Sequence, residues 1–299
     1  MKNTLVKKLL STIALGALVF NLGACAQKPA QTPASSDAVT SQDSATASDA
    51  QANADGKVVL KGIVDLVPHS EIIEHVKPIL AKQGIEIVLV ATAADSTTNE
   101  RLNSGEIDFN YFQHLPYLES EVKANGYKLV SAGGIHIEPI TAYSDKYKSK
   151  EEIPDNAVVA IPNDGTNEYR ALRILEENGF ITLDPAAKDS LSASVKDITE
   201  YKKSIKIVEI DSAQIIPTKD DYDFFITNTN KALEAGITST KLFSEGKDSP
   251  YANIIAVRQE DLDNPAVKAL VDALLSEETQ QWIADKYNGA VIPVITLGN

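Results

Sequence analysis

Short apolar runs and amphipathic segments alternate along the chain from residue 57 to its end. Runs rich in β-branched residues predict strands, and they cover residues 58–64, 85–90, 107–109, 128–132, 158–161, 205–210, 223–227 and 253–257. Apolar residues at helical spacing predict helices over residues 70–83, 98–103, 116–124, 167–177, 265–275 and 277–286, with short helices after the strands that end at residues 210 and 227. Gly84 stops the first helix, and Pro78 should kink that helix or shift its ends.

This order of strands and helices predicts an α/β fold. Strands that alternate with helices imply parallel sheets covered by helices on both faces. The rhythm stops in a polar stretch at residues 144–156 and then restarts, so two lobes fit the chain better than one sheet. We expect the chain to cross between the lobes where extended segments interrupt the alternation of strands and helices, at residues 137–143 and 248–251.

Two crossings make the first lobe discontinuous in sequence. We expect lobe 1 to comprise residues 57–140 and 251–299, and lobe 2 to comprise residues 141–250. Each lobe would hold a mostly parallel sheet flanked by helices. Ligands bind such sheets beyond the carboxyl ends of the strands, and in this arrangement that edge faces the cleft between the lobes. Polar residues that follow the strands are therefore the candidates for function.

The first 25 residues have the three parts of a bacterial export signal. Three lysines precede an apolar run over residues 9–20, which is too short to span a bilayer. The signal ends in Leu22-Gly23-Ala24-Cys25, the pattern of a lipobox. We therefore predict a signal peptide over residues 1–24 and a lipid anchor on Cys25; a stray cysteine in an ordinary secretory signal is the alternative. Two or more acyl chains anchor a protein stably to a membrane.

The composition of the chain predicts a linker and argues against nucleic-acid binding and disulfide bonds. Residues 26–55 are almost all Ala, Ser, Thr, Gln, Asp and Pro, so we predict a disordered linker over residues 25–56. The net charge is −14, from 28 basic and 42 acidic residues, which argues against a nucleic-acid partner. The single cysteine excludes an intramolecular disulfide.

Sequence motifs for catalysis are absent. The chain has no G-x-S-x-G, H-E-x-x-H, P-loop or G-x-G-x-x-G pattern, and lipidation would consume its only thiol. We predict a binding protein that is not an enzyme and uses no cofactor. A metal-capturing lipoprotein is an alternative, although the spacing of the four histidines matches no compact metal site; these are His69, His75, His114 and His136.

Four segments gather polar and aromatic residues where predicted strands end, namely residues 68–70, 110–117, 161–170 and 224–230. In the first segment, His69 is a candidate ligand contact, and capping of the next helix by His69 or Ser70 is the alternative. The second segment contains Tyr111, Phe112 and His114. It fits a ligand pocket with an aromatic wall better than core packing, because buried Gln and His side chains need hydrogen-bond partners.

The third and fourth segments could receive a small anion. Asn167 and Arg170 are three residues apart on one face of a predicted helix, near its positive N-terminus. Arg170 could grip a carboxylate there with two parallel hydrogen bonds, and a surface arginine paired with a glutamate is the alternative. Asn228 could bridge a bound amino group and carboxylate, or it could cap the following helix.

Taken together, these motifs resemble one family, the NlpA/MetQ-type lipoproteins, which are the methionine-binding components of ABC importers. The resemblance spans residues 58–293 and the lipobox, and it is carried by Asn110-Tyr111-Phe112-Gln113-His114, Ala160-Ile161-Pro162-Asn163-Asp164, Thr166-Asn167, Arg170-Ala171-Leu172, Asn228-Thr229-Asn230, Ala235-Gly236 and Ser249-Pro250-Tyr251-Ala252-Asn253. It implies a two-lobed periplasmic-binding-protein-like fold. It also implies a protein held by its lipid on the extracytoplasmic face of a bacterial cell membrane, with an ABC permease and ATPase complex as partners.

The resemblance also implies roles for individual residues. Arg170 would bind the carboxylate of an amino acid, and Asn167 and Asn228 would hold its amino and carboxylate ends. The side-chain pocket would be lined by residues of the second segment, Tyr111, Phe112 and His114.

The chain departs from the family pattern in one pocket loop. Family members usually carry Asp-Tyr-x-x-Pro-Asn after the second strand, whereas this chain has Ala94-Asp95-Ser96-Thr97-Thr98-Asn99. Small polar groups at Asp95 and Ser96 thus replace an aromatic cover, and Lys231 stands where a tyrosine is often found. The expected ligand is methionine, L- or D-, or a close derivative, and a more polar amino acid or a small peptide is the alternative.

Overall fold

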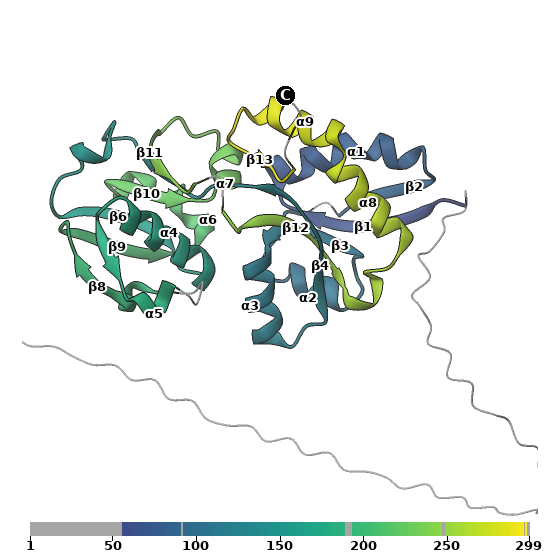
Figure 1. Cartoon of the computed structure of the whole chain (residues 1–299), viewed down its shortest axis with the longest axis horizontal. Coiled ribbons are helices and arrows are strands. Elements are labelled where there is room, and N and C mark those ends of the chain that lie inside the picture. Colours follow the sequence, from purple (N-terminus) through teal and green to yellow (C-terminus); the bar gives the residue numbers. More distant parts are fainter. Residues whose placement is uncertain (1–55, 91, 189–192, 247–248, 296, 298–299) are drawn as a thin grey trace, which may run out of the picture. The chain divides into compact units, whose positions relative to one another are not determined.

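The structure is a computed structural model that describes residues 56–90, 92–188, 193–246, 249–295 and residue 297. The predicted signal peptide, Cys25 and the predicted linker up to residue 55 lie outside the described residues. Two main β-sheets, each with its own helices, form the described chain (Figure 1), and we call them lobe 1 and lobe 2. Within this part of the chain, none of the helices has the length and apolar character needed to cross a membrane.

Lobe 1 is built on a six-stranded sheet with the strand order β13-β4-β12-β3-β1-β2. Its strands are β1 (Val58–Val64), β2 (Ile85–Leu89), β3 (Phe109–His114), β4 (Leu129–Ile137), β12 (Ala252–Arg258) and β13 (Ile292–Pro293). Strands β2 and β3 pair with β1 in parallel, whereas β12 runs antiparallel to both β3 and β4.

Helices cover both faces of the lobe 1 sheet. On one face lie α1 (Glu71–Ala81), α8 (Pro265–Leu275) and α9 (Glu277–Tyr287), and on the other lie α2 (Thr98–Asn103) and α3 (Leu115–Asn125) (Figure 1). Successive residues of a strand point to opposite faces, so the neighbours Ile254 and Ile255 of β12 enter different cores. The larger core joins the apolar stripe of α1 to Phe109 and Tyr111 of β3.

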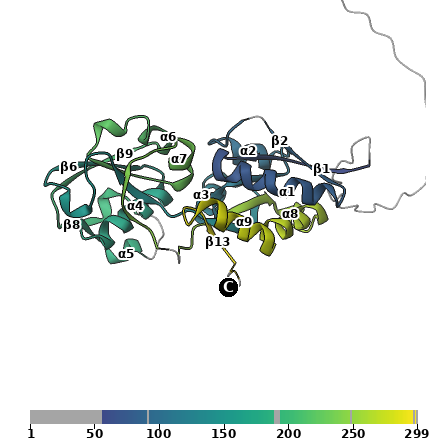
Figure 2. The ribbon, with the colours of Figure 1, turned by 90° about the horizontal axis from the view of Figure 1, so that it is seen from above.

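Lobe 2 is built on a five-stranded sheet with the strand order β11-β5-β10-β6-β9. Its strands are β5 (Thr141–Ser144), β6 (Ala157–Pro162), β9 (Ile205–Ile210), β10 (Phe224–Thr227) and β11 (Thr240–Ser244), and β7 (Ile181–Leu183) and β8 (Ile198–Tyr201) form a separate antiparallel pair. Helices α4 (Gly165–Glu177) and α5 (Pro185–Lys188) lie on one face of the sheet, and α6 (Ser212–Ile215) and α7 (Thr229–Glu234) lie on the other (Figure 2).

The α/β fold with two lobes and two crossings is confirmed, and so are most of the predicted elements. The bounds predicted for β1, α2, β9 and α8 are those that the structure has. Helix α1 continues through Pro78, and Gly84 adopts a φ of +77°, a left-handed conformation that glycine accepts without strain.

The structure differs from the prediction for β3, which would end this strand at residue 109. The strand runs from Phe109 to His114, so the aromatic segment is the strand itself rather than the loop that follows it. Strands β5, β7, β8, β11 and β13 were not predicted. They are two to five residues long, which is too short for a hydrophobic period to be recognised.

We expected parallel pairing for most of each sheet, but both sheets are mixed, and parallel pairing is confined to β2-β1-β3 and β9-β6-β10. Antiparallel pairs complete both sheets around β12 and β5. These two strands are the first that follow each crossing from the other lobe. Antiparallel pairing needs no covering crossover helix, so a strand that enters directly from the other lobe can pair in this way.

The first crossing is shorter than predicted and consists of Glu138, Pro139 and Ile140, between β4 and β5. All four residues of β5 are buried, and the strand pairs with both β10 and β11, so it belongs to the sheet and not to the link. The second crossing connects β11 to β12. Residues 249–251 of the predicted link belong to it, and Asp248 lies outside the described residues.

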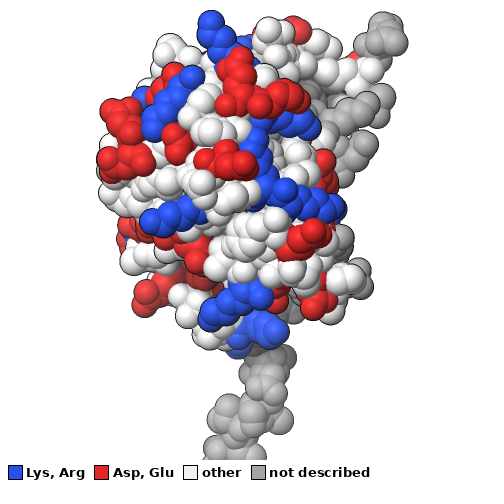
Figure 3. Space-filling view, turned by 90° about the vertical axis from the view of Figure 1, so that its left-hand side faces the viewer, with Lys and Arg blue, Asp and Glu red and all other residues white. Residues whose placement is uncertain are grey.

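One face of lobe 2 carries charges of both signs. In Figure 3, which looks at the left-hand end of the molecule in Figure 1, Lys and Arg side chains alternate with Asp and Glu. Opposite charges at a solvated surface contribute little to stability. This face therefore offers no continuous basic surface of the kind that nucleic acids need.

Candidate ligand-binding site

A cavity of about 280 Å³ lies where the two lobes meet, and residues of both lobes line it. In lobe 1 the lining includes residues at the ends of β1 and β3, and in lobe 2 it includes residues that follow β6, β9 and β10. These are the carboxyl ends of the parallel strands, where α/β sheets bind ligands. Six of the predicted site residues line the cavity, namely Asp95, Phe112, His114, Asn167, Arg170 and Asn228.

Three hydrogen-bond donors converge on a single oxygen in this cavity. Oδ1 of Asn167 accepts from Nη1 of Arg170 at 3.3 Å, from Nδ2 of Asn228 at 3.0 Å and from Nε2 of His114 at 3.3 Å. His114 belongs to lobe 1 and the other residues belong to lobe 2. Asn167 itself is oriented by Asp164, whose carboxylate accepts from its Nδ2 and its backbone N–H at 3.0 Å. The arrangement is suited to an oxygen that carries negative charge.

His114 presents a donor to this point because its other ring nitrogen is occupied. Its Nδ1 accepts from the backbone N–H of Tyr117 and so caps the N-terminus of α3. Burial and the nearby charge of Arg170 lower the pKa of His114 to about 3, so the ring is neutral at physiological pH. A neutral ring that accepts at Nδ1 carries its proton at Nε2, and that proton faces Asn167.

Asn228 also directs its side chain into the cavity. It occupies the N-cap position of α7, but its side chain makes no capping hydrogen bond. Its Nδ2 donates to Asn167 instead. The capping alternative that the sequence left open for Asn228 is therefore not realised.

Arg170 is almost completely buried, at 2% exposure, and it is already paired with an acid. Its Nε and Nη2 donate to the two carboxylate oxygens of Glu245 at 3.2 and 2.6 Å, and its guanidinium lies 4.4 Å from the ring centre of Tyr251. The two guanidinium nitrogens that we expected to bind a ligand carboxylate are thus occupied by Glu245. Nη1 remains directed at the cavity through Asn167.

A bulge in β3 decides which of its side chains reach the cavity. The pairing of β3 with β12 shifts register at Phe112, between the pairs Tyr111–Ile255 and Gln113–Ile254. Phe112, Gln113 and His114 line the cavity, whereas Tyr111 does not. Tyr111 is completely buried in the core of lobe 1, so its predicted place in the pocket lining is wrong, because the strand turns its ring to the face covered by α1.

His69 also lies behind the cavity wall and not in it. Its ring packs edge-on against Tyr111 and His136, with ring centres 4.7 and 5.0 Å apart, and its Nε2 lies 3.0 Å from Oδ1 of Asn253. The cap that we considered at this position is absent too, because Asp65 caps the preceding turn and Ser70 makes no capping bond. His69 therefore supports Asn253, which does line the cavity.

Two of the four histidines do converge with an acid, which the sequence spacing did not predict. In the part of the chain that the structure describes, His69, His136 and Glu138 bring possible metal ligands within 4.8 Å of one another. Hydrogen bonds account for this cluster. Nε2 of His136 lies 2.7 Å from Oε1 of Glu138, and its Nδ1 faces the hydroxyl of Tyr111. Both histidines are completely buried and Glu138 is almost so, and we assign the cluster no metal.

Asp95 lines the cavity, and one of its carboxylate oxygens accepts hydrogen bonds from the neighbouring Thr97. Oδ1 accepts from the backbone N–H of Thr97 at 2.8 Å and from its hydroxyl at 2.7 Å. These hydrogen bonds lower the pKa of Asp95. The residue holds the start of α2 and faces the cavity, together with its neighbour Ser96.

Several residues of the cavity wall were not among the predicted site residues. Lobe 1 contributes Asp65, Tyr117, Glu138 and Asn253, and lobe 2 contributes Asn230 and Lys231. Oδ2 of Asp65 accepts from Nδ2 of Asn230 at 2.7 Å and pairs with Nζ of Lys231 at 3.0 Å, which joins the lobes. A signal for Glu138 exists in the sequence, because it is a lone acid within the apolar segment 137–143.

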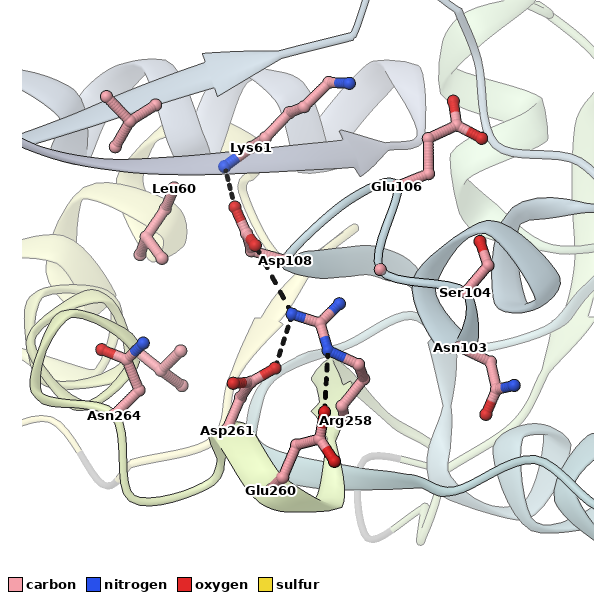
Figure 4. A pocket seen from close by; sticks show the side chains of 13 residues that line it. Leu60, Lys61, Asn103, Ser104, Glu106, Asp108, Arg258, Glu260, Asp261 and Asn264 are labelled. Carbon is pink, nitrogen blue, oxygen red and sulfur yellow. Dashed lines mark hydrogen bonds and ion pairs between the residues drawn. The ribbon is translucent and has the colours of Figure 1, made fainter. Parts of the chain in front are cut away.

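A larger cavity, of about 640 Å³, lies at the opposite end of β3 and β12 and is lined by lobe 1 alone (Figure 4). Its central cation, Arg258, is already satisfied. Nη1 donates to the carbonyl oxygens of Leu102 and Ile107, at 3.1 and 2.6 Å, and Nη2 pairs with Asp261 at 2.6 Å. Arg258 thus fastens the turn between α2 and β3, and we regard the cavity as structural.

Comparisons with known proteins identify the family of this chain. The model of the NlpA lipoprotein family matches residues 62–295. The methionine-binding lipoprotein MetQ of Bacillus subtilis is 38% identical over 234 residues, which are 76% of this chain and 85% of that protein. Outer membrane lipoprotein 2 of Mannheimia haemolytica is 36% identical over 290 residues, or 96% of this chain and 98% of that protein.

A solved structure is similar throughout its length. It is a nutrient-binding protein from Burkholderia cenocepacia bound to methionine, with 40% identity and a TM-score of 0.75 over 79% of this chain and 100% of that chain. Both the family model and these identities cover most of the two lobes. This chain therefore belongs to the NlpA lipoprotein family.

Proposed function

We propose that the chain is the substrate-binding lipoprotein of an ABC importer and that it captures methionine, L- or D-, or a close derivative in the cavity between its lobes. The relatives named above support the ligand class, since one is a methionine-binding lipoprotein and another was solved with methionine bound. The protein would bind and release its ligand without chemistry on it and without a cofactor.

The convergence of three donors on Oδ1 of Asn167 carries this proposal. A carboxylate oxygen of the ligand would take the position that this amide oxygen holds, and it would receive hydrogen bonds from Arg170, Asn228 and His114. A charge-assisted hydrogen bond contributes about 1.5–3 kcal/mol when water is excluded. Donors from both lobes would also make ligand binding favour the arrangement in which the lobes meet.

The remaining lining supports an amino acid side chain of mixed character. Phe112 and Tyr117 offer aromatic surface for a thioether, which contacts rings favourably. Asp95, Ser96 and Asp211 lie on the same lining and are polar. This polarity supports the second candidate, a more polar amino acid or a small peptide.

We further propose how the chain is organised around this site. Residues 1–24 would be the signal peptide, Cys25 the lipid anchor and residues 25–56 the linker; residues 57–140 and 251–299 would form lobe 1, and residues 141–250 lobe 2. The lipid would hold the protein at the extracytoplasmic face of a bacterial cell membrane. Its partners there would be the ABC permease and ATPase complex, without nucleic acid.

Calorimetry on the mature protein tests the proposal. We expect methionine to bind and Arg170→Ala to weaken binding at least 100-fold, whereas the control Arg173→Ala, on the same helix, should bind as the original does. Arg173 pairs with Glu176 and Glu177 at the surface and does not line the cavity. Native affinity in the Arg170→Ala protein would contradict the assignment.

A panel of amino acids and dipeptides separates the two ligand classes. Methionine as the one strong ligand would eliminate the polar alternative, and a polar amino acid or dipeptide as the strongest ligand would establish it. Metal analysis of the purified protein addresses the metal-capturing alternative, which requires a stoichiometric metal ion.

A further inference from the structure

Glu138 is a buried acid that faces the cavity from the first crossing between the lobes. It is 3% exposed and lines the cavity between the lobes. Its position is fixed from both sides, because β4 of lobe 1 ends one residue before it and β5 of lobe 2 begins three residues after it.

The hydrogen bonds that Glu138 accepts come from neutral groups. Nε2 of His136 donates to Oε1 at 2.7 Å, and the backbone N–H of Asn230 donates to Oε2 at 2.8 Å. Burial lowers the pKa of His136 to about 3, so this ring carries no charge at physiological pH. Nε2 of His69 also lies 3.5 Å from Oε1, so the second acceptor position that these contacts leave open is on Oε2.

The cations nearest to Glu138 are engaged elsewhere. Nε and Nη2 of Arg170 hold the carboxylate of Glu245, and the bond from Nη2 toward Glu138 ends on its backbone carbonyl, at 2.8 Å. Lys231 pairs with Asp65 and Glu234. Among the described residues, then, neither lysine nor arginine forms an ion pair with this carboxylate. A buried carboxylate without a cation is costly, and a positive group in the cavity would remove that cost.

We propose that Glu138 is the subsite for the ligand's α-ammonium group and that His136 and Tyr111 are positioning residues that hold its carboxylate toward the cavity. This inference rests on the proposed function. The contact between Nη2 of Arg170 and the carbonyl of Glu138 brings the two subsites side by side. An α-amino acid carries its carboxylate and its ammonium on one carbon, so adjacent subsites of opposite charge fit that class of ligand.

The positioning role follows from the order of the hydrogen bonds. The Tyr111 hydroxyl donates to Nδ1 of His136, which places the proton of the neutral ring on Nε2, where it faces Glu138. His69 packs edge-on against both rings. The residues that do not line the cavity thus act on the ligand through Glu138.

Paired ligands test the proposal. Calorimetry compares methionine with its analogue without the amino group, 4-(methylsulfanyl)butanoate, on the mature protein and on Glu138→Gln. We expect the original protein to favour methionine by about 10- to 100-fold, the range of one charge-assisted hydrogen bond. In Glu138→Gln, methionine should bind about as weakly as the analogue, whose own affinity should stay within about threefold.

Control variants distinguish the effect of the Glu138 charge from that of a charge elsewhere on the protein and from a loss of folding. Glu119→Gln removes the same charge from an exposed site on α3 and should leave the preference for methionine unchanged. Tyr111→Phe and His136→Gln should reduce the preference, with the weaker effect in Tyr111→Phe, whereas a merely structural role would weaken both ligands equally. Circular dichroism identifies a variant that does not fold.

The outcomes distinguish the two levels of the proposal. If neither ligand binds the original protein, the proposed function fails. If methionine binds and the original protein does not prefer it over the analogue, or if Glu138→Gln keeps the full preference, the ammonium subsite is wrong while the proposed function stands. The comparison on the original protein decides the matter even if Glu138→Gln does not fold.

Discussion

Replacing Glu245 by glutamine should destabilise the ligand-free protein and strengthen ligand binding at the same time. Glu245 is the acid that neutralises Arg170, and the side chains are 14% and 2% exposed. In Glu245→Gln the guanidinium stays buried and keeps its hydrogen bonds to Asn167 and to the carbonyl of Glu138. It loses its counter-charge, which a ligand carboxylate could then supply.

The size of the effect follows from the burial of the pair. Removing one partner of a buried ion pair typically costs about 3–5 kcal/mol. The glutamine amide oxygen can still accept one hydrogen bond from Arg170, and water reaches the exposed part of residue 245, so we expect a loss of about 2–3 kcal/mol. For a protein of this size, a loss of that order lowers the melting temperature by roughly 5–10 °C.

Urea unfolding with and without saturating methionine measures both parts of this prediction. The ligand-free variant should lose the stability stated above, and the additional stabilisation by methionine should exceed that of the original protein, since the ligand now neutralises Arg170. The matched control is Glu177→Gln, whose acid pairs with Arg173 at the surface at 3.0 Å; it should change stability by less than about 0.5 kcal/mol. Unchanged stability of Glu245→Gln, or weaker methionine binding by a folded variant, would refute the reasoning.

Two further predictions concern stability alone. Burial and the neighbouring Glu209 raise the pKa of Glu168 to about 7, so the folded protein binds this proton more tightly than the unfolded chain does. The free energy of unfolding should therefore fall as the pH rises from about 4.5 to 7. We expect a loss of about 1–2 kcal/mol after solvent screening. Urea unfolding at pH 5 and pH 8 should show this loss, and Glu168→Gln should abolish most of it; an undiminished loss in the variant would contradict the assignment. Gly62→Ala should destabilise the protein by about 1–3 kcal/mol in the same assay, because its Cβ would come closer than 3.0 Å to the buried ring of Phe109, and an unchanged unfolding midpoint would contradict it.

The sequence predicts the framework of the fold well because the framework depends on local patterns. β1, α2, β9 and α8 have clear hydrophobic periods, and their bounds were predicted correctly. The strands that were missed depend on the rest of the sheet. β5 has four residues, of which three are polar or aromatic, and it is a strand because β10 and β11 pair with it on both sides.

The candidate site was predicted in part. Asn167, Arg170 and Asn228 follow strand ends in the sequence, and the structure brings them to the cavity. Tyr111 was misplaced because we expected the strand to end at residue 109, whereas Tyr111 belongs to β3 and points to the same core as Phe109. The bulge at Phe112, beyond which Gln113 and His114 line the cavity, arises from pairing with β12. β12 lies about 140 residues further along the chain, and no pattern within residues 109–114 encodes the bulge.

Arg170 links the cavity to both crossings, so its removal has two effects. Its guanidinium donates to the carbonyl of Glu138 in the first crossing, and it pairs with Glu245 and packs on Tyr251 in the second. Arg170→Ala thus removes a ligand contact and loosens both links between the lobes, so its large expected effect combines two causes. Asn228 contacts Asn167 and makes no hydrogen bond to either crossing. Replacing Asn228 by alanine therefore removes one neutral donor from the cavity and leaves the links between the lobes intact. We expect this substitution to weaken ligand binding by about 1 kcal/mol, the contribution of one neutral hydrogen bond.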